Sequence, residues 1–205
     1  MKKLFLIITF VCNLQTFGQE IPAIKQTAQQ KNEFKISAVW RLYPIASFHF
    51  GDNAFAKAHK NGGGLGTSLA LLNYGNFRAG LGYEFTSYSV SDVSKVGNFN
   101  HSNAQSFNYF ISYDLELTER LTFVPNIGYG NDYVNQKTRS QHFGHYSGNH
   151  LKIGLNTDWQ LGTSLAAFVG IHYINSQYDI KTNAAFEDYL QQSNQMQLTF
   201  GLKIY

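Results

Sequence analysis

The residues of this chain that are best suited to chemistry lie in one polar stretch, NQKTRSQHFGHYSGNH, at positions 135–150. It contains His142, His145, Ser147 and His150. Neutral imidazoles bind divalent metals, and a histidine beside a serine can act as the base that activates the hydroxyl. The histidines are loosely spaced, and neither a carboxylate nor a cysteine lies between them. We therefore predict a solvated polar loop and no metal site.

The His-x-Ser pattern of His145 and Ser147 resembles that of the lipid A deacylases, eight-stranded outer-membrane barrels with a Ser/His/Glu triad. The resemblance implies a base at His145 and a nucleophile at Ser147. In that family an Asn follows the Ser directly, whereas Gly148 intervenes here before Asn149. The family's Glu about a dozen residues further on is absent, and the nearest downstream acid, Asp158, is expected at the periplasmic end of its strand. A lipid A deacylase-like hydrolase is therefore an alternative, and we predict that the protein is not an enzyme.

A second set of polar residues alternates with apolar residues along the chain. It holds five basic residues, four acidic residues and one histidine. A buried charge without a partner costs several kcal/mol, so nearly balanced charges on one face of a sheet indicate a packed network of ion pairs and hydrogen bonds. The predicted network consists of Lys35, Arg41, Arg78, Glu84, Asp114, Glu116, Lys152, Asp158, His172 and Lys203.

Eight segments of alternating polarity offer the elements that would place this network on one face. In each segment apolar side chains occupy every second position and so share one face of a strand. Each segment is about 10 residues long, which is the length of a tilted strand that crosses a bilayer. The segments cover residues 34–42, 65–71, 77–86, 107–117, 121–130, 151–160, 165–173 and 196–205.

The connections between these segments alternate between short and long. Tight turns are expected at 73–76, 118–120 and 161–163, and long loops at 51–63, 91–104, 134–149 and 179–193. Such alternation is typical of an up-and-down meander. An open sheet would leave two unpaired edges, which closure removes, and only helices and closed barrels satisfy every backbone group in lipid. We predict an all-β protein, an eight-stranded antiparallel up-and-down transmembrane β-barrel.

A soluble eight-stranded barrel, with its apolar face inward, is the alternative architecture. Composition argues against it, because aromatic residues make up 16% of the chain and charged residues only 14%, against about 25% in soluble domains. The polar face is also rich in small residues, which suit a narrow interior. Aromatic residues of the apolar face are expected to form a girdle at the membrane interface: Tyr83, Phe85, Phe107, Tyr109, Tyr129, Trp159 and Tyr173.

The N-terminal segment MKKLFLIITFVCNLQTFG has the pattern of a secretory signal peptide. We predict a signal peptide over 1–18, a periplasmic lead-in over 19–33 and the barrel over 34–205. Removal of the leader also removes Cys12, the one cysteine of the chain, so disulfides cannot contribute. It leaves 14 basic residues against 13 acidic ones, which gives no reason to expect nucleic acid as a partner.

The mature chain resembles the small eight-stranded outer-membrane barrels of the OmpA/OmpX type. The leader, the eight alternating segments and a terminal strand with a final aromatic residue, FGLKIY, carry the resemblance. It implies location in the outer membrane of a Gram-negative-type bacterium, contact with lipid and lipopolysaccharide, and assembly by the barrel-assembly machinery. In one detail the sequence departs from the family, because Tyr205 lies in the opposite phase from the lipid-facing Ile204.

We predict a non-enzymatic outer-membrane barrel with a packed polar lumen, without a cofactor, that serves envelope structure and surface interaction. An extracellular ligand would bind at the long loops. The packed lumen is expected because an eight-stranded barrel is just wide enough for its side chains to fill it. A narrow channel or small-solute conduit is the first alternative.

Overall fold

A computed structural model describes residues 33–138, 142–181 and 187–205. The predicted signal peptide and lead-in lie outside the described residues, apart from Glu33. Among the described residues, no helix is both long and apolar enough to cross a bilayer. Helical structure is limited to α2 (Ala54–Ala58), the 3₁₀ turn η2 (Val93–Lys95) and α3 (Glu187–Gln191) in the described part of the chain.

Antiparallel strands make up nearly all of the described structure. Eight are long, and the ninth, β5, has two residues and pairs with the start of β6. They are β1 (Phe34–Phe50), β2 (Gly62–Tyr74), β3 (Phe77–Ser89), β4 (His101–Tyr113), β5 (Leu115–Glu116), β6 (Leu121–Lys137), β7 (His142–Gln160), β8 (Leu165–Tyr178) and β9 (Gln192–Ile204).

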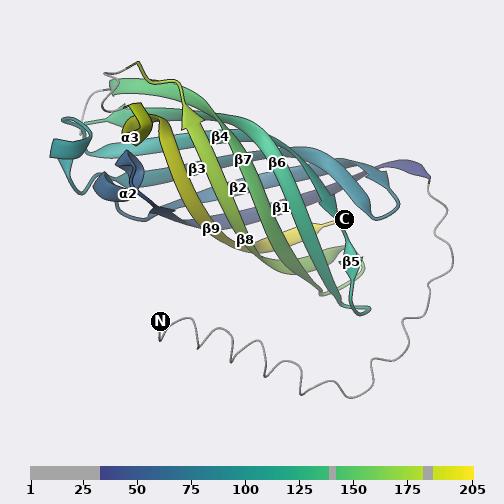
Figure 1. Cartoon of the computed structure of the whole chain (residues 1–205). Coiled ribbons are helices and arrows are strands. Elements are labelled where there is room, and N and C mark those ends of the chain that lie inside the picture. Colours follow the sequence, from purple (N-terminus) through teal and green to yellow (C-terminus); the bar gives the residue numbers. More distant parts are fainter. Residues whose placement is uncertain (1–32, 139–141, 182–186) are drawn as a thin grey trace, which may run out of the picture. The chain divides into compact units, whose positions relative to one another are not determined.

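The sheet closes into a barrel because its first and last strands pair. Each long strand pairs with the next along the chain, and β1 also pairs with β9, with Trp40 opposite Ile204. Figure 1 shows the strands wound at a steep tilt, with α2 and α3 at one end and β5 with the C-terminus at the other. The predicted eight-stranded antiparallel barrel is confirmed, and every strand edge along the barrel wall has a partner.

The outward face of the barrel is apolar over its central part. Phe200, Val169 and Tyr109 are 64%, 63% and 61% exposed, whereas the polar side chains between them in sequence point inward and are buried. This orientation is the reverse of that in a soluble barrel, and water would disfavour so much exposed apolar surface. The exterior is therefore a transmembrane surface, as alternation predicted.

Apolar side chains change sides near the end of the barrel that carries α2. Along β6, Ile127 and Tyr129 face outward, but five residues beyond Tyr129 the apolar residue Val134 is fully buried inside. Tyr88, Val134 and Tyr178 form a small apolar core in this part of the lumen. The barrel is thus built for lipid over most of its height and for water at this end.

This change explains why the predicted long loop over 134–149 is wrong. Strand β6 continues to Lys137 and β7 begins at His142, in continuous register from Gln136 opposite Gly144 inward. The remaining loops are also shorter than predicted, because β2, β4 and β9 begin earlier. The outward residues of these strand ends are polar, so the ends lack the alternation of a lipid-facing strand and the sequence predicts a loop there.

Two other boundaries differ from the predicted segments. The segment 107–117 is not one strand, because β4 ends at Tyr113 and β5 pairs separately with β6. In β2, a register shift between Ala70 and Leu72 leaves both Leu71 and Leu72 facing outward. A bulge of this kind adds one residue to a strand, which strict alternation cannot anticipate.

Glycine is required where neighbouring strands approach most closely. A Cβ atom on Gly201 of β9 would lie 2.0 Å from the carbonyl oxygen of Leu42 in β1. Backbone atoms cannot move aside as a flexible side chain can, so this contact would force the two strands apart. The absence of a side chain at Gly201 therefore permits the pairing of β1 with β9 that closes the barrel.

We expect Gly201→Val to lower the stability of the folded barrel by about 1–3 kcal/mol, which is typical of overpacking. The measurement is the temperature at which the fast-migrating folded band on a gel converts to the slow, boiled form. Gly162→Ala is the matched control, because a Cβ there meets nothing within 4 Å. Equal conversion temperatures for the two variants would contradict the proposed role of Gly201.

Candidate functional site in the barrel lumen

An ion-pair cluster fills the lumen at the end that carries the C-terminus. Arg41 of β1 donates two hydrogen bonds to Asp158 of β7, over 2.8 and 2.7 Å. Lys203 of β9 donates to the same carboxylate over 2.8 Å. Asp158 and Lys203 are only 2% and 1% exposed. A bidentate guanidinium pair with a second cation holds these buried charges in a fixed geometry.

A second acid extends this cluster across the lumen. Arg78 of β3 donates to Asp114 over 2.7 Å, and the Lys203 ammonium lies 3.9 Å from the same carboxylate. The ring of Tyr205 lies against two of these cations, with its centroid 4.7 Å from Lys203 Nζ and 5.9 Å from the Arg78 guanidinium carbon. Tyr205 thus covers cations of the lumen, in agreement with its departure from the lipid-facing phase.

A second charge cluster lies in the middle of the lumen. The carboxylate of Glu84 accepts hydrogen bonds from the Lys152 ammonium and, over 2.9 Å, from the Tyr43 hydroxyl. Lys152 also donates to Gln197 Oε1 over 3.1 Å. The Arg41 guanidinium carbon lies 4.6 Å from the centroid of the Phe168 ring, and Tyr43 packs edge-on against the same ring. These contacts join the middle cluster to the one described above.

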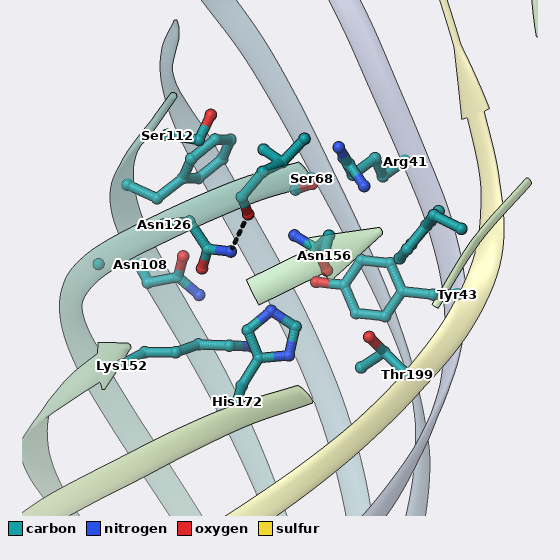
Figure 2. Close-up of a pocket in the computed structure, with 14 residues that line it drawn as sticks. Arg41, Tyr43, Ser68, Asn108, Ser112, Asn126, Lys152, Asn156, His172 and Thr199 are labelled. Atoms are coloured by element: carbon teal, nitrogen blue, oxygen red, sulfur yellow. Dashed lines mark hydrogen bonds between the residues drawn. The ribbon is translucent and has the colours of Figure 1, made fainter. Parts of the chain in front are cut away.

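A small polar cavity lies between these clusters, with a volume of about 50 Å³. Figure 2 shows polar side chains from several strands pointing toward one another around it. Asn156 Oδ1, His172 Nδ1 and Thr199 Oγ1 are buried here without a hydrogen-bond partner among the described residues. Buried polar atoms ordinarily have partners, and this volume suits one or two water molecules. The cavity has the size and polarity of an internal water site.

A third polar cluster lies further toward the end that carries α2. Asp132 of β6 accepts hydrogen bonds from Ser106 and, over 2.8 Å, from Ser176. The Nδ1 atom of His150 lies 2.9 Å from Asp132 Oδ1. All of these side chains come from adjacent strands of the β4–β6–β7–β8 wall. Together they surround a carboxylate that is 5% exposed.

Helix α2 closes the lumen above this cluster. Asn53 caps the helix by accepting a hydrogen bond from the Ala56 amide, over 2.9 Å. The capped helix places Phe55, 2% exposed, between the rings of His49 and His59, with both centroid distances at 4.7 Å. Phe55 also packs edge-on against Tyr88. We call α2 with its inserted Phe55 the plug.

The structure brings together eight of the ten residues predicted for the lumen network and excludes two. Lys35 and Glu116 are exposed and belong to no cluster, so their assignment to the network is wrong. Lys35 lies at the start of β1 opposite Asn73, and Glu116 lies in β5 beyond the end of β4. Both lie where the wall ends, and an alternating pattern there no longer implies burial. His172 is buried beside Lys152 in the wall of the cavity, and its Nδ1 atom has no hydrogen-bond partner among the described residues.

The candidate catalytic residues do not form a site with the lumen. His145 and Ser147 lie on the outward, exposed face of β7, and no hydrogen bond joins them in the described structure. His145 instead packs against the ring of Tyr133. His150 points inward from the same strand, so it cannot meet His145 around one metal ion. The described residues include no group of three metal-ligating side chains, and the side chain of His142 lies outside the described part.

Sequence reasoning missed Asp132 and the plug, and it assigned His150 to a solvated loop. Asp132 and His150 lie in or next to the stretch that was read as loop, where inward and outward positions had not been distinguished. Strand alternation extended from Tyr129 would have placed Asp132 inward. Phe55 carries no comparable signal, because nothing in a five-residue helix reveals that it turns into the lumen.

No protein-family model and no curated protein matches this sequence. Among solved structures, Neisserial surface protein A (NspA) matches with a TM-score of 0.63 at 10% identity, over 82% of this chain and 96% of that one. OprG of Pseudomonas aeruginosa matches with a TM-score of 0.48 at 10% identity, over 83% of this chain and 96% of that one. A major outer membrane protein of Thermus thermophilus matches with a TM-score of 0.48 at 15% identity, over 82% of this chain and 99% of that one.

The chain has the fold of a small outer-membrane β-barrel. At these identities the likeness extends to the fold alone, and it agrees with the closed eight-stranded sheet and the apolar exterior described above. In such a barrel the membrane-spanning lumen is where buried charges are costly.

We expect Glu84→Ala to destabilise the barrel by about 3–5 kcal/mol, because it leaves the buried Lys152 ammonium without its carboxylate. Combining Glu84→Leu with Lys152→Met should recover most of this loss, since both charges are then removed. Urea unfolding in detergent micelles, followed by tryptophan fluorescence, measures both variants. A double variant that is as unstable as Glu84→Ala would contradict the pairing.

A pH-dependent stability is expected for the plug. Burial lowers the pKa of His59, which lies outside the membrane-spanning strands, from 6.5 to about 4. Between these values the released segment binds a proton that the packed segment does not, so packing weakens as pH falls from about 6.5 to 4, by roughly 3 kcal/mol. Hydrogen exchange of residues 54–58, corrected for intrinsic rates, measures this change. His59→Phe should abolish most of it, whereas replacement of the exposed His101 by Gln should leave it intact.

Proposed function

We propose that the protein spans the outer membrane as a non-enzymatic, non-conducting barrel that serves envelope structure and presents a rigid outer rim for surface interactions. The filled lumen is the observation that carries this proposal. From the C-terminal end outward, the lumen holds the Asp158 and Asp114 clusters, the Glu84 cluster, the Asp132 cluster and then the plug. The cavity of about 50 Å³ between them has room for water only.

A hydrated ion would have to disrupt each of these clusters in turn. Arg41 and Lys203 are bound to one carboxylate, and Lys152 to another, in a nearly dry interior. Separating such pairs costs several kcal/mol at each layer. The same contacts that would block an ion also connect β1, β3, β7 and β9 across the lumen, so they support a role in mechanical stability of the envelope.

The outer rim supports the proposed role in surface interaction. Strands β6 and β7 pair from Lys137 opposite His142 inward, so most of the predicted loop is hydrogen-bonded strand. The plug fixes the segment between β1 and β2, and η2 with Phe99, which is fully buried, orders the one between β3 and β4. Ordered rims lose little entropy on binding, and this favours specific recognition of an extracellular ligand.

The hydrolase alternative gains no support from the arrangement of its candidates. A serine nucleophile needs an adjacent base, and the base needs an orienting carboxylate. His145 packs on Tyr133, and Asp158 belongs to the lumen cluster with Arg41 and Lys203. For this reason we keep the non-enzymatic assignment.

We expect purified barrel to give no discrete openings in planar lipid bilayers, because every layer of the lumen is closed by packed side chains. The barrel is first shown to be folded by its heat-dependent gel migration, so that a silent recording reflects a closed lumen and not absent protein. Single-channel current is the measurement. Reproducible, discrete openings of folded protein would contradict the proposed function and favour the narrow-channel alternative.

A further inference from the structure

The outward face of the barrel changes composition sharply where the apolar belt ends. On five strands, β3, β4, β7, β8 and β9, the outward residue that follows the last apolar side chain is an amide or a hydroxyl, and on β6 Asn131 lies between the outward Tyr129 and Tyr133. Examples are Asn149 after Leu151 on β7 and Asn175 after Tyr173 on β8. We define the amide belt as the exterior residues Ser87, Asn103, Gln105, Asn131, Asn149, Asn175, Gln177 and Asn194.

Members of the amide belt face one another across the strands on either side of the β4–β6 pair, where Gln105 instead lies opposite Tyr133. Asn131 pairs in register with Asn149, and Asn149 with Gln177. Asn131 Nδ2 donates to Asn149 Oδ1 over 2.7 Å, and Asn175 Nδ2 donates to Asn194 Oδ1 over 3.0 Å. These bonds fix the direction of each amide group along the surface.

Each amide keeps hydrogen-bonding capacity for an external partner. A side-chain amide has two N–H donors and an oxygen with two lone pairs. The bond from Asn131 Nδ2 leaves Asn131 Oδ1 and the Asn149 amide nitrogen available on the exposed face. The belt therefore offers hydrogen-bond donors and acceptors along the border of the apolar surface.

The belt also carries tyrosine rings and no charge. The hydroxyl of Tyr173 donates to Asn194 over 2.7 Å, that of Tyr83 donates to Gln105 over 3.2 Å, and Tyr133 stands opposite Gln105 in register. Phosphate recognition relies on Arg and Lys, and none of the eight belt residues is charged. Neutral donors and acceptors beside flat aromatic faces suit the hydroxyls and C–H faces of a sugar.

We propose that the amide belt binds the uncharged saccharide headgroups of glycolipids in the leaflet that surrounds it. A lipid headgroup is the occupant, because the belt directly continues the apolar surface that the acyl chains cover. This inference rests on the proposed location in a membrane. Beyond that location, the inference specifies the lipid headgroup that the barrel prefers, which carries sugar hydroxyls and no phosphate.

The test uses folded barrel in nanodiscs of phosphatidylethanolamine and phosphatidylglycerol with a minor share of digalactosyl diacylglycerol. Native mass spectrometry counts the lipids that the barrel retains. We expect retention of the glycolipid over phosphatidylglycerol by about fivefold relative to their shares, as one or two extra hydrogen bonds allow. Replacement of Asn131, Asn149 and Asn175 by Ala should bring this ratio close to one. Retention should be unaffected by salt, because no ion pair is involved.

Two matched variants keep the test decisive. Thr163→Ala, at an exposed position between β7 and β8 at the opposite rim, should leave the ratio unchanged. Asn149→Lys should shift retention toward phosphatidylglycerol in a salt-sensitive manner. Each variant is first shown to be folded by its gel migration.

Two results would overturn the inference: an unchanged ratio in the triple variant, or salt-sensitive preference of the unmodified barrel for phosphatidylglycerol. A folded and non-conducting barrel without glycolipid preference would overturn this inference alone. Discrete conductance would instead overturn the proposed function, so the two failures are distinguishable.

Discussion

Closure of the sheet is the constraint on which the rest of this structure depends. In lipid, a backbone N–H or C=O without a partner costs several kcal/mol, and pairing of β1 with β9 leaves no such edge. Closure also divides the side chains into two populations with different surroundings. Those on one face meet acyl chains, and those on the other meet only one another in a narrow interior. Both the apolar exterior and the ion-pair clusters follow from that division.

The interior solves a problem that closure creates. An eight-stranded wall is too narrow for a separate core, yet half of its side chains must point inward. Glycines such as Gly154 and Gly170 make room, because a Cβ at either position would come within 2.2 Å of a neighbouring side-chain atom. The remaining polar groups are held by pairing, as in the contacts of Asp158 with Arg41 and Lys203. Packing by small residues and pairing of charges are therefore complementary.

Alternation predicted the membrane-spanning part of the fold well, since lipid on one side and a packed interior on the other impose the same two-residue period everywhere. Arg41, Glu84, Lys152 and Asp158 were placed inside for that reason. The rule failed at both rims, for different reasons. At the end of the barrel that carries the C-terminus the wall stops, and Lys35 is exposed to water even though it alternates with apolar residues.

At the outer rim the environment outside the wall changes from lipid to water while the strands continue. Val134 and Tyr178 then turn inward, and Asn131 and Asn175 outward, so the apolar phase inverts. A pattern defined by lipid contact reads this inversion as a loop. The partners within each cluster were also beyond prediction, because they depend on stagger between strands that are distant in sequence.

The composition of the inner ion-pair cluster has a consequence for the order of assembly. Arg41 belongs to β1, Asp158 to β7 and Lys203 to β9, so these three charges meet only when the first and last strands have both joined the sheet. An unclosed sheet that contains β1 or β7 leaves at least one of these charges without its partners, and burial of that charge in lipid is costly. Burial of this cluster in the bilayer is therefore favourable only after the final strand has paired with the first.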